Sequence, residues 1–289
     1  MGVQTVMCTK KTILVTGANG YIGSHAVKSL LSRGANVIAA DIAMDFVDPA
    51  AEHLTCDIFN TDPVEYLKGR KVDACLHLAW RAGFQHGSPL HMEMLSAHYS
   101  FLSRLIRYGI PQLAVMGTMH EIGYFEGAVD ENTPCNPLSL YGISKNALRL
   151  ATELLCRENK VIYQWLRGYY ILGDDARNNS VFAKIMEAAE AGKKEFPFVS
   201  GKKCYDFIPV GSLGDQIAAA VMQTEVTGVI NCCSGKAESI GSIAEKFICD
   251  HGLEISLKYG AFPDRVYDSP AIWGNDLKIK QILESEKNR

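Results

Sequence analysis

The chain has 289 residues, a net charge of −3 and a hydrophobic content of 47 %. Its length exceeds the roughly 100 to 200 residues of a typical domain, so we expect one large unit with a smaller second lobe. The slightly acidic balance offers no basic surface for non-specific binding to nucleic acid or anionic membranes, and no stretch approaches the roughly 18 apolar residues of a membrane span.

A predicted strand at residues 12–16 leads into a turn rich in glycine. Glycines occupy positions 17, 20 and 23, and the apolar residues that follow, up to residue 33, fall on one face of a predicted helix. Such a turn lets the backbone approach a pyrophosphate, which then lies on the N–H groups at the start of the helix. An ordinary strand-to-helix turn is the alternative. The residues expected to bind a dinucleotide here are Gly17, Asn19, Gly20, Tyr21, Ile22 and Gly23.

The second predicted strand, residues 36–40, ends in Asp41, which follows the last glycine by about 20 residues. A carboxylate at this position accepts hydrogen bonds from the adenosine ribose and repels a 2′-phosphate, so the sequence predicts NAD rather than NADP. Asp45 is a weaker candidate for this role, and an Asp that merely caps a turn is the alternative. Further along, Asp57 and Ile58 are expected near the adenine, unless Asp57 is a solvated loop residue.

Strands and helices continue to alternate along the rest of the chain. This alternation predicts an α/β fold with a doubly wound parallel sheet of the Rossmann type and a smaller C-terminal substrate-binding lobe. The loops at 81–90 and 123–139 leave strand ends and should rim the cofactor cleft. The further strands are predicted at 73–78, 112–117, 161–166 and 228–232, and the further helices at 90–108, 141–158, 180–192, 212–223 and 239–250.

Tyr141 and Lys145 lie four residues apart in the predicted helix 141–158. At this spacing the phenol and the ammonium share one helical face, so the positive charge is expected to favour the tyrosinate and depress the pKa of Tyr141. A phenol tuned in this way is an acid or base for a sugar-like hydroxyl or carbonyl. An exposed helical pair without a function is the alternative.

The glycine turn together with Tyr141 and Lys145 resembles the extended short-chain dehydrogenase/reductase family, in its NAD-dependent epimerase/dehydratase branch, which acts on nucleotide-activated sugars. The resemblance covers nearly the whole chain. Residues 74–80 resemble the fourth strand of that family, where His-Leu-Ala-Ala is usual and Trp80 replaces the final Ala. The resemblance implies cofactor contacts at Leu78, Ala79, Trp80, Tyr141 and Lys145.

Residues 112–123 resemble the fifth strand of the family and the loop that carries the catalytic hydroxyl, which falls at Thr118. The resemblance implies that Tyr141 exchanges the proton on the reacting oxygen and that Thr118 holds this oxygen. Lys145 would keep Tyr141 acidic and contact the nicotinamide ribose. His120, in the same loop, is either a second acid/base or a histidine without a role.

The family also implies a division of the chain and an assembly. Residues 1–166, with 203–230 returning to them, would form the NAD-binding domain, and 167–202 with 231–289 the substrate-binding lobe. The helices around 95–108 and 141–156 would pair across a two-fold axis into a four-helix homodimer interface. Burial of these helices against their own sheet is the alternative.

The substrate-binding positions depart from the family pattern. Tyr170 stands where a substrate-binding Asn is usual, and Tyr205 replaces an Arg, with Lys203 close by. The segment around Arg265 resembles the one that delivers an Arg to the sugar diphosphate, which a guanidinium meets with a bidentate fork. A surface arginine is the alternative. The expected substrate contacts are Thr118, His120, Tyr170, Lys203 and Arg265.

The resemblance favours an NAD(H)-dependent oxidoreductase that reduces a 4-keto-6-deoxyhexose on a nucleotide. A 4-epimerase with tightly bound NAD is the alternative, and a non-catalytic dinucleotide-binding sensor or scaffold is an alternative of another class. Dehydration is disfavoured, because Met119 and His120 stand where dehydratases of the family carry Asp and Glu.

The nine cysteines form no Cys-x-x-Cys pair and have no histidine partner at metal-ligand spacing. Several fall in apolar elements, where cysteine behaves as a small hydrophobic residue. We therefore expect free thiols in the reducing cytoplasm and no metal site.

Overall fold

A parallel sheet of seven strands forms the centre of the protein in a computed structural model that describes residues 10–173, 180–264 and 268–288. The strand order is β12-β7-β5-β4-β1-β2-β3, and every neighbouring pair is parallel. The predicted α/β fold with a parallel sheet is thus confirmed. The strands are β1 Thr12–Thr16, β2 Asn36–Asp41, β3 Glu52–Thr55, β4 Ala74–His77, β5 Gln112–Thr118, β7 Ile162–Gly168 and β12 Gly228–Cys232.

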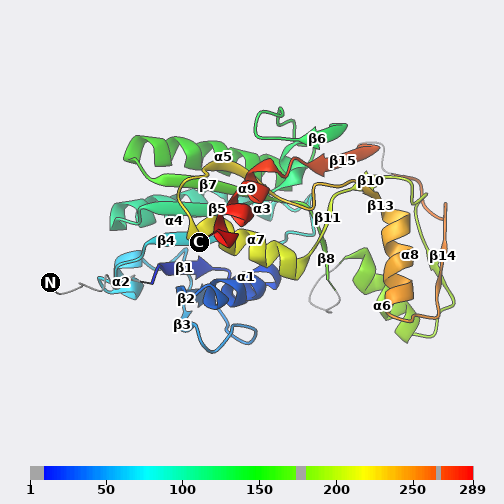
Figure 1. Cartoon of the computed structure of the whole chain (residues 1–289), viewed down its shortest axis with the longest axis horizontal. Helices are drawn as coiled ribbons and strands as arrows, with labels where there is room; N and C mark the ends of the chain where they lie inside the picture. The colour runs from blue at the N-terminus through cyan, green and yellow to red at the C-terminus, as the bar shows by residue number, and fades with distance from the viewer. Residues whose placement is uncertain (1–9, 174–179, 265–267, 289) are drawn as a thin grey trace.

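Helices cover both faces of this sheet (Figure 1). Ile13 and Val15 of β1 pack with one group of helices, and Leu14, between them, packs with the other. Successive side chains of a strand point to opposite faces, so an unbroken apolar strand is what a sheet covered on both sides requires. The first group comprises α1 Tyr21–Ser32, α7 Val210–Met222 and α9 Leu277–Lys287; the second comprises α2 Pro63–Leu67, α4 Leu95–Tyr108 and α5 Leu140–Asn159.

A smaller lobe with its own apolar core lies at one end of the molecule, to the right in Figure 1. Its helices are α6 Val181–Glu190 and α8 Ile240–Asp250. Its short strands form a four-stranded sheet, β13-β10-β15-β6, and two pairs, β11-β8 and β14-β9. They are β6 Gly127–Val129, β8 Tyr170–Leu172, β9 Glu195–Pro197, β10 Cys204–Tyr205, β11 Phe207–Pro209, β13 Glu238–Ser239, β14 Ser256–Lys258 and β15 Ala271–Gly274.

Asp206, between β10 and β11, ties the lobe to the sheet. Its buried carboxylate accepts hydrogen bonds from the backbone N–H groups of Ser234, at 2.7 Å, and Gly235, at 2.9 Å, just after β12. It also accepts one from Gly274 N, at 3.1 Å, at the end of β15. Three chain segments that are distant in sequence therefore meet at one carboxylate.

The predicted elements of the sheet agree closely with the structure. Strands 12–16 and 228–232 have the predicted bounds, whereas the helix predicted at 90–108 is divided at Met94 into α3 Leu90–Glu93 and α4. The sequence reading missed α2, α9, β3 and the short strands of the lobe. The division into domains stays a prediction, although α9 packs against α7 and β12 on the sheet. Among the described residues, none of the helices combines the length and apolar character needed to cross a membrane.

Candidate active site

The glycine turn between β1 and α1 is packed so closely that Gly17 and Gly23 have no room for a side chain. Gly17 has φ +71°, and a Cβ on it would lie 2.5 Å from Ala79 N. A Cβ on Gly23 would lie 2.0 Å from Gly17 O. The start of α1 after Gly20 has no side-chain cap, so the turn and the positive end of the helix dipole fit a pyrophosphate.

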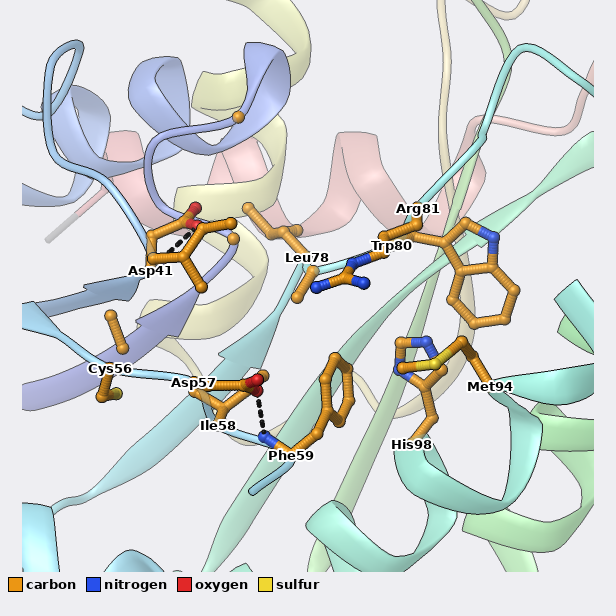
Figure 2. Close-up of a pocket in the computed structure, with 15 residues that line it drawn as sticks. Asp41, Cys56, Asp57, Ile58, Phe59, Leu78, Trp80, Arg81, Met94 and His98 are labelled. Carbon is orange, nitrogen blue, oxygen red and sulfur yellow. Dashed lines mark hydrogen bonds between the residues drawn. The ribbon is translucent and has the colours of Figure 1, made fainter. Parts of the chain in front are cut away.

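A cavity of about 190 Å³ adjoins this turn at the carboxyl ends of the central strands. Asp41 borders it, and its carboxylate accepts hydrogen bonds from Asn19 N, at 3.0 Å, and Ile42 N, at 2.7 Å. Figure 2 shows Asp57 on the same side of the cavity, where its carboxylate accepts a hydrogen bond from Phe59 N at 3.0 Å. The lining includes Gly17, Gly20, Asp41, Asp57, Ile58, Leu78, Ala79 and Trp80, all predicted cofactor residues, and also Ile42, Phe59, Arg81, Met94 and His98.

Of the other residues in the predicted cofactor set, Gly23 and its neighbours belong to the turn or the start of α1, whereas Tyr141 and Lys145 lie on α5 and are not part of the lining of the cavity among the described residues. Asn19 accepts a hydrogen bond from Phe46 N through its Oδ1, at 2.7 Å, and so fixes the loop after β2. Tyr21 and Ile22 begin α1. Asn19, Tyr21 and Ile22 are not part of the lining of the cavity among the described residues.

Thr118 and Tyr141 meet at the end of β5. Tyr141 lies in the first turn of α5, which Ser139 caps by accepting a hydrogen bond from Gly142 N at 3.1 Å. The hydroxyl of Thr118 lies close enough to the phenol of Tyr141 to influence its pKa. Tyr141 N also donates to the carbonyl of His86, at 3.0 Å, so the loop after β4 is fastened to the start of α5.

The electrostatics of Tyr141 and Lys145 differ from the sequence prediction. Burial raises the pKa of Tyr141 to about 12, although the nearby hydroxyl of Thr118 acts in the opposite direction. Burial also lowers the pKa of Lys145 to about 7. The predicted depression of the Tyr141 pKa by Lys145 is therefore wrong for this structure, because desolvation of the phenolate is the largest influence on this pKa and raises it. Lys145 Nζ instead donates to Met116 O, at 2.8 Å.

A buried Glu121 supports Thr118 from the 3₁₀ turn Met119–Glu121. Glu121 Oε1 accepts hydrogen bonds from Thr118 N, at 2.7 Å, and from Trp165 Nε1, at 2.9 Å. Its Oε2 lies 3.4 Å from Arg167 Nε in a fully buried ion pair. The sequence reading missed Glu121, although Thr-x-x-Glu from 118 to 121 is the spacing of a capping box.

A second cavity, of about 500 Å³, opens beside Tyr141 toward the lobe. His86 stacks on the Tyr141 ring at a centroid distance of 5.2 Å and lies 4.2 Å from the His120 ring. His120 lines the cavity as predicted, but the sequence reading missed His86. The remaining lining residues are mainly apolar or aromatic: Gly87, Met119, Gly123, Leu138, Ser139, Leu140, Ile143, Tyr170, Tyr205, Asp268, Ser269 and Ile272.

The other predicted substrate residues are distributed unevenly around this cavity. Tyr170 lines it and lies 4.3 Å from the ring of Tyr205. Lys203 is absent from the lining among the described residues, and its ammonium donates to the carbonyl of Asp268, which does line the cavity. Arg265 lies outside the described residues, so its predicted role stays a prediction.

Comparison with known proteins connects this geometry to one family. The sequence profile of the NAD dependent epimerase/dehydratase family matches residues 13–233. The chain is 44 % identical over 269 residues to a dTDP-6-deoxy-L-talose 4-dehydrogenase (NAD(+)) of Aggregatibacter actinomycetemcomitans, with 91 % of this chain and 98 % of the relative covered. It is 25 % identical to a UDP-glucose 4-epimerase of Lactobacillus helveticus, with 94 % and 90 % covered. Its fold is similar to that of a UDP-N-acetylglucosamine 4-epimerase from Methanobrevibacter ruminantium M1, with a TM-score of 0.83 at 21 % identity and coverage of 95 % and 92 %.

Proposed function

The chain belongs to the NAD dependent epimerase/dehydratase family, and we propose that it interconverts the C4 hydroxyl and the 4-keto group of a nucleotide-activated 6-deoxyhexose. The observation that carries this proposal is the 44 % identity, over nearly the full length of both chains, to a dTDP-6-deoxy-L-talose 4-dehydrogenase. The family, the NAD dependence and the class of sugar-nucleotide oxidoreductase predicted from the sequence are confirmed at this level.

The residues around Tyr141 suit proton handling at the sugar oxygen. The hydride chemistry at C4 would be supplied by bound NAD. Tyr141 gives a proton to the oxygen when a ketone is reduced and takes it back when an alcohol is oxidised. Thr118, held by Glu121, donates a hydrogen bond that fixes this oxygen beside the phenol. Lys145 is buried next to them, and its ammonium would steady a phenolate formed during oxidation, although it does not bring the resting pKa of Tyr141 below its ordinary value.

The raised pKa of Tyr141 determines the protonation state in which the phenol meets its substrate. With a pKa of about 12, Tyr141 is protonated at neutral pH and is ready to act as an acid toward a ketone oxygen. The same residues serve oxidation in reverse, which is the direction named for the relative from A. actinomycetemcomitans. We propose reduction of a 4-keto-6-deoxyhexose as the forward reaction, with oxidation of the C4 hydroxyl as its reverse at the same residues.

A panel of nucleotide sugars tests the proposal. Purified protein is incubated with NADH and with 4-keto-6-deoxyhexoses linked to dTDP, UDP, GDP or CDP, and the absorbance of NADH is followed. We expect NADH consumption with one of the 4-keto sugars and its loss in Tyr141→Phe. NADH consumption that persists in Tyr141→Phe would contradict the role of the phenol.

Epimerisation is the second candidate, because relatives such as the L. helveticus protein are 4-epimerases. An epimerase would be purified with stoichiometric NAD and would interconvert two sugars without consuming NADH. A dinucleotide-binding sensor would bind NAD and turn over none of the sugars. Its Tyr141→Phe variant would bind NAD as the wild type does. NADH consumption in the panel identifies the reductase. The NAD content of the purified protein and a product assay on 4-hydroxy nucleotide sugars separate the epimerase from the sensor.

We propose a homodimer formed by α4 and α5. These helices pack against each other, and apolar side chains on them remain exposed, with Leu150 at 52 % and Leu154 at 46 %. Leu150 and Leu154 are four residues apart and so lie on one face of α5. Exposed apolar residues gathered on one helical face are typical of a protein–protein interface.

We propose that the enzyme works in the cytoplasm. NAD and nucleotide-activated sugars are both available there, and the proposed reaction needs both. Fractionation of cells that express the tagged protein would place it with soluble cytoplasmic markers if the proposal is correct.

A further inference from the structure

Trp80 follows β4 and lies between the cofactor cavity and the Tyr141–Lys145 pair. It lines the cavity, and Figure 2 shows its indole at the end of the cavity that lies away from Asp41. Its ring centroid is 3.8 Å from Lys145 Nζ and 6.2 Å from the centroid of the Tyr141 ring. Trp80 is therefore in contact with one member of the pair and close to the other.

The orientation of the indole is fixed by two buried histidines. Trp80 Nε1 donates a hydrogen bond to His91 Nδ1, at 3.1 Å. Because Nδ1 accepts this bond, the ring proton of His91 is on Nε2, which donates to Gln85 O at 3.0 Å. His98 stacks on the indole at a centroid distance of 4.3 Å with an interplanar angle of 19°. Since His91 and His98 are each at most 2 % exposed, Trp80 has little freedom to turn.

Lys145 needs such a contact because its ammonium is buried. Its exposed fraction is 3 %, and among the described residues only Met116 O accepts a hydrogen bond from Nζ. An ammonium has three N–H donors, and burial disfavours its charge. The face of an indole attracts a cation and is the strongest such partner among the aromatic side chains.

We propose that Trp80 is a positioning residue, whose indole face holds the Lys145 ammonium against the Met116 carbonyl and so keeps it in place beside Tyr141. The inference rests on the proposed function, because the place of Lys145 affects turnover only if the Tyr141–Lys145 pair handles the proton. Trp80 itself acts through Lys145 and takes no part in proton transfer.

Other groups near Lys145 also influence its charge. The charge of Glu121 raises the pKa of Lys145, but burial lowers this pKa by more. His77, on β4, and His98, on α4, are neutral at physiological pH, because burial lowers their pKa values to about 3 and about 2. Tyr141 is neutral as well. A substitution of Trp80 thus removes a contact of Lys145 without adding or removing a charged side chain.

Two substitutions separate the ring face from the N–H group. Trp80→Phe keeps an aromatic face and loses the hydrogen bond to His91, whereas Trp80→Leu loses both. We expect kcat of Trp80→Leu to fall roughly thirtyfold below that of Trp80→Phe, which is the factor that about 2 kcal/mol for a desolvated cation–π contact represents. We expect the pH at which kcat declines on the alkaline side to be lower in Trp80→Leu than in Trp80→Phe. Equal kcat values and equal pH profiles would overturn the proposal.

A structural readout keeps the proposal testable whatever the substrate is. Crystal structures of the ligand-free variants should show Lys145 Nζ on Met116 O in Trp80→Phe and displaced from it in Trp80→Leu. If Lys145 is unmoved in Trp80→Leu, the inference about Trp80 is overturned, even if the enzyme is inactive on every sugar tested. Inactivity of the wild type would instead contradict the proposed function. If Trp80→Leu does not fold, Trp80→Met, with a longer flexible side chain, replaces it in both measurements.

Discussion

Glu121 is a buried charge on which the geometry of Thr118 depends. Its carboxylate is fully buried and pairs with Arg167, which is equally buried, while it also holds Thr118 N. Removal of one partner of a buried ion pair leaves the other charge uncompensated, which costs about 3–5 kcal/mol. We expect Glu121→Gln to lower the free energy of unfolding by about this amount in urea titrations.

A matched control for Glu121 is available on the surface. Glu131 pairs with Lys278, but its side chain is 44 % exposed, so water replaces the lost partner. Glu131→Gln should change the free energy of unfolding by less than about 1 kcal/mol. Equal losses in the two variants would show that the Glu121–Arg167 pair has no special weight.

The buried Lys145 makes folding stability depend on pH in a predictable direction. Burial lowers its pKa from 10.5 to about 7, so between about pH 7 and 10 the unfolded chain binds a proton here that the folded chain does not. Stability therefore rises with pH over this window, because a group that binds more protons in the unfolded state favours folding as protons are removed. Lys11, whose pKa burial lowers to about 8, adds to the same slope.

Lys145→Met should reduce this slope without abolishing it. Urea titrations of the ligand-free protein at several pH values between 7 and 9.5 measure it directly. Lys11→Met serves as the parallel variant, since it should remove only the part of the slope that begins at about pH 8. An unchanged slope in Lys145→Met would mean that this ammonium keeps its charge when the protein folds.

At the scale of elements, the glycine turn between β1 and α1 is expected to control cofactor binding. A Cβ on Gly17 collides with Ala79 N at 2.5 Å, so Gly17→Ala must displace the turn from the segment that follows β4. Gly34→Ala is the matched control, because Gly34 has φ +77° and no atom within 4 Å of the added Cβ. Both variants carry the backbone strain of a positive φ, about 1 kcal/mol, but only Gly17→Ala also carries the collision.

Isothermal titration with NAD distinguishes the two glycine variants. We expect Gly17→Ala to lose at least about tenfold in affinity, because its backbone N–H groups no longer converge on a pyrophosphate. Gly34→Ala should bind NAD like the wild type and melt at a slightly lower temperature. A loss of affinity common to both would assign the effect to general destabilisation.

The elements also show how far the sequence was informative. The apolar runs of β1 and β12 and the glycine turn are local patterns, and they predicted the sheet and its cofactor edge. The approach of Thr118 to Tyr141 required a family resemblance, because β5 and α5 meet only in three dimensions. The contact of Trp80 with Lys145 depends on how the loop after β4 folds against α5, and strands of two to four residues in the lobe are too short for a periodic pattern to show.

At the scale of the whole molecule, the proposed dimer makes the last prediction. A charge on each of two neighbouring exposed positions should prevent α5 from burying its apolar face against a second copy, since an unpaired buried charge is costly. We expect the double variant Leu150→Glu, Leu154→Glu to sediment as a monomer in analytical ultracentrifugation, and the wild type as a dimer. Leu277→Glu is the control, because Leu277 is 69 % exposed but begins α9, away from α4 and α5. A monomeric wild type, or a double variant that remains a dimer, would contradict this interface. Loss of the dimer in Leu277→Glu would instead place the interface at α9.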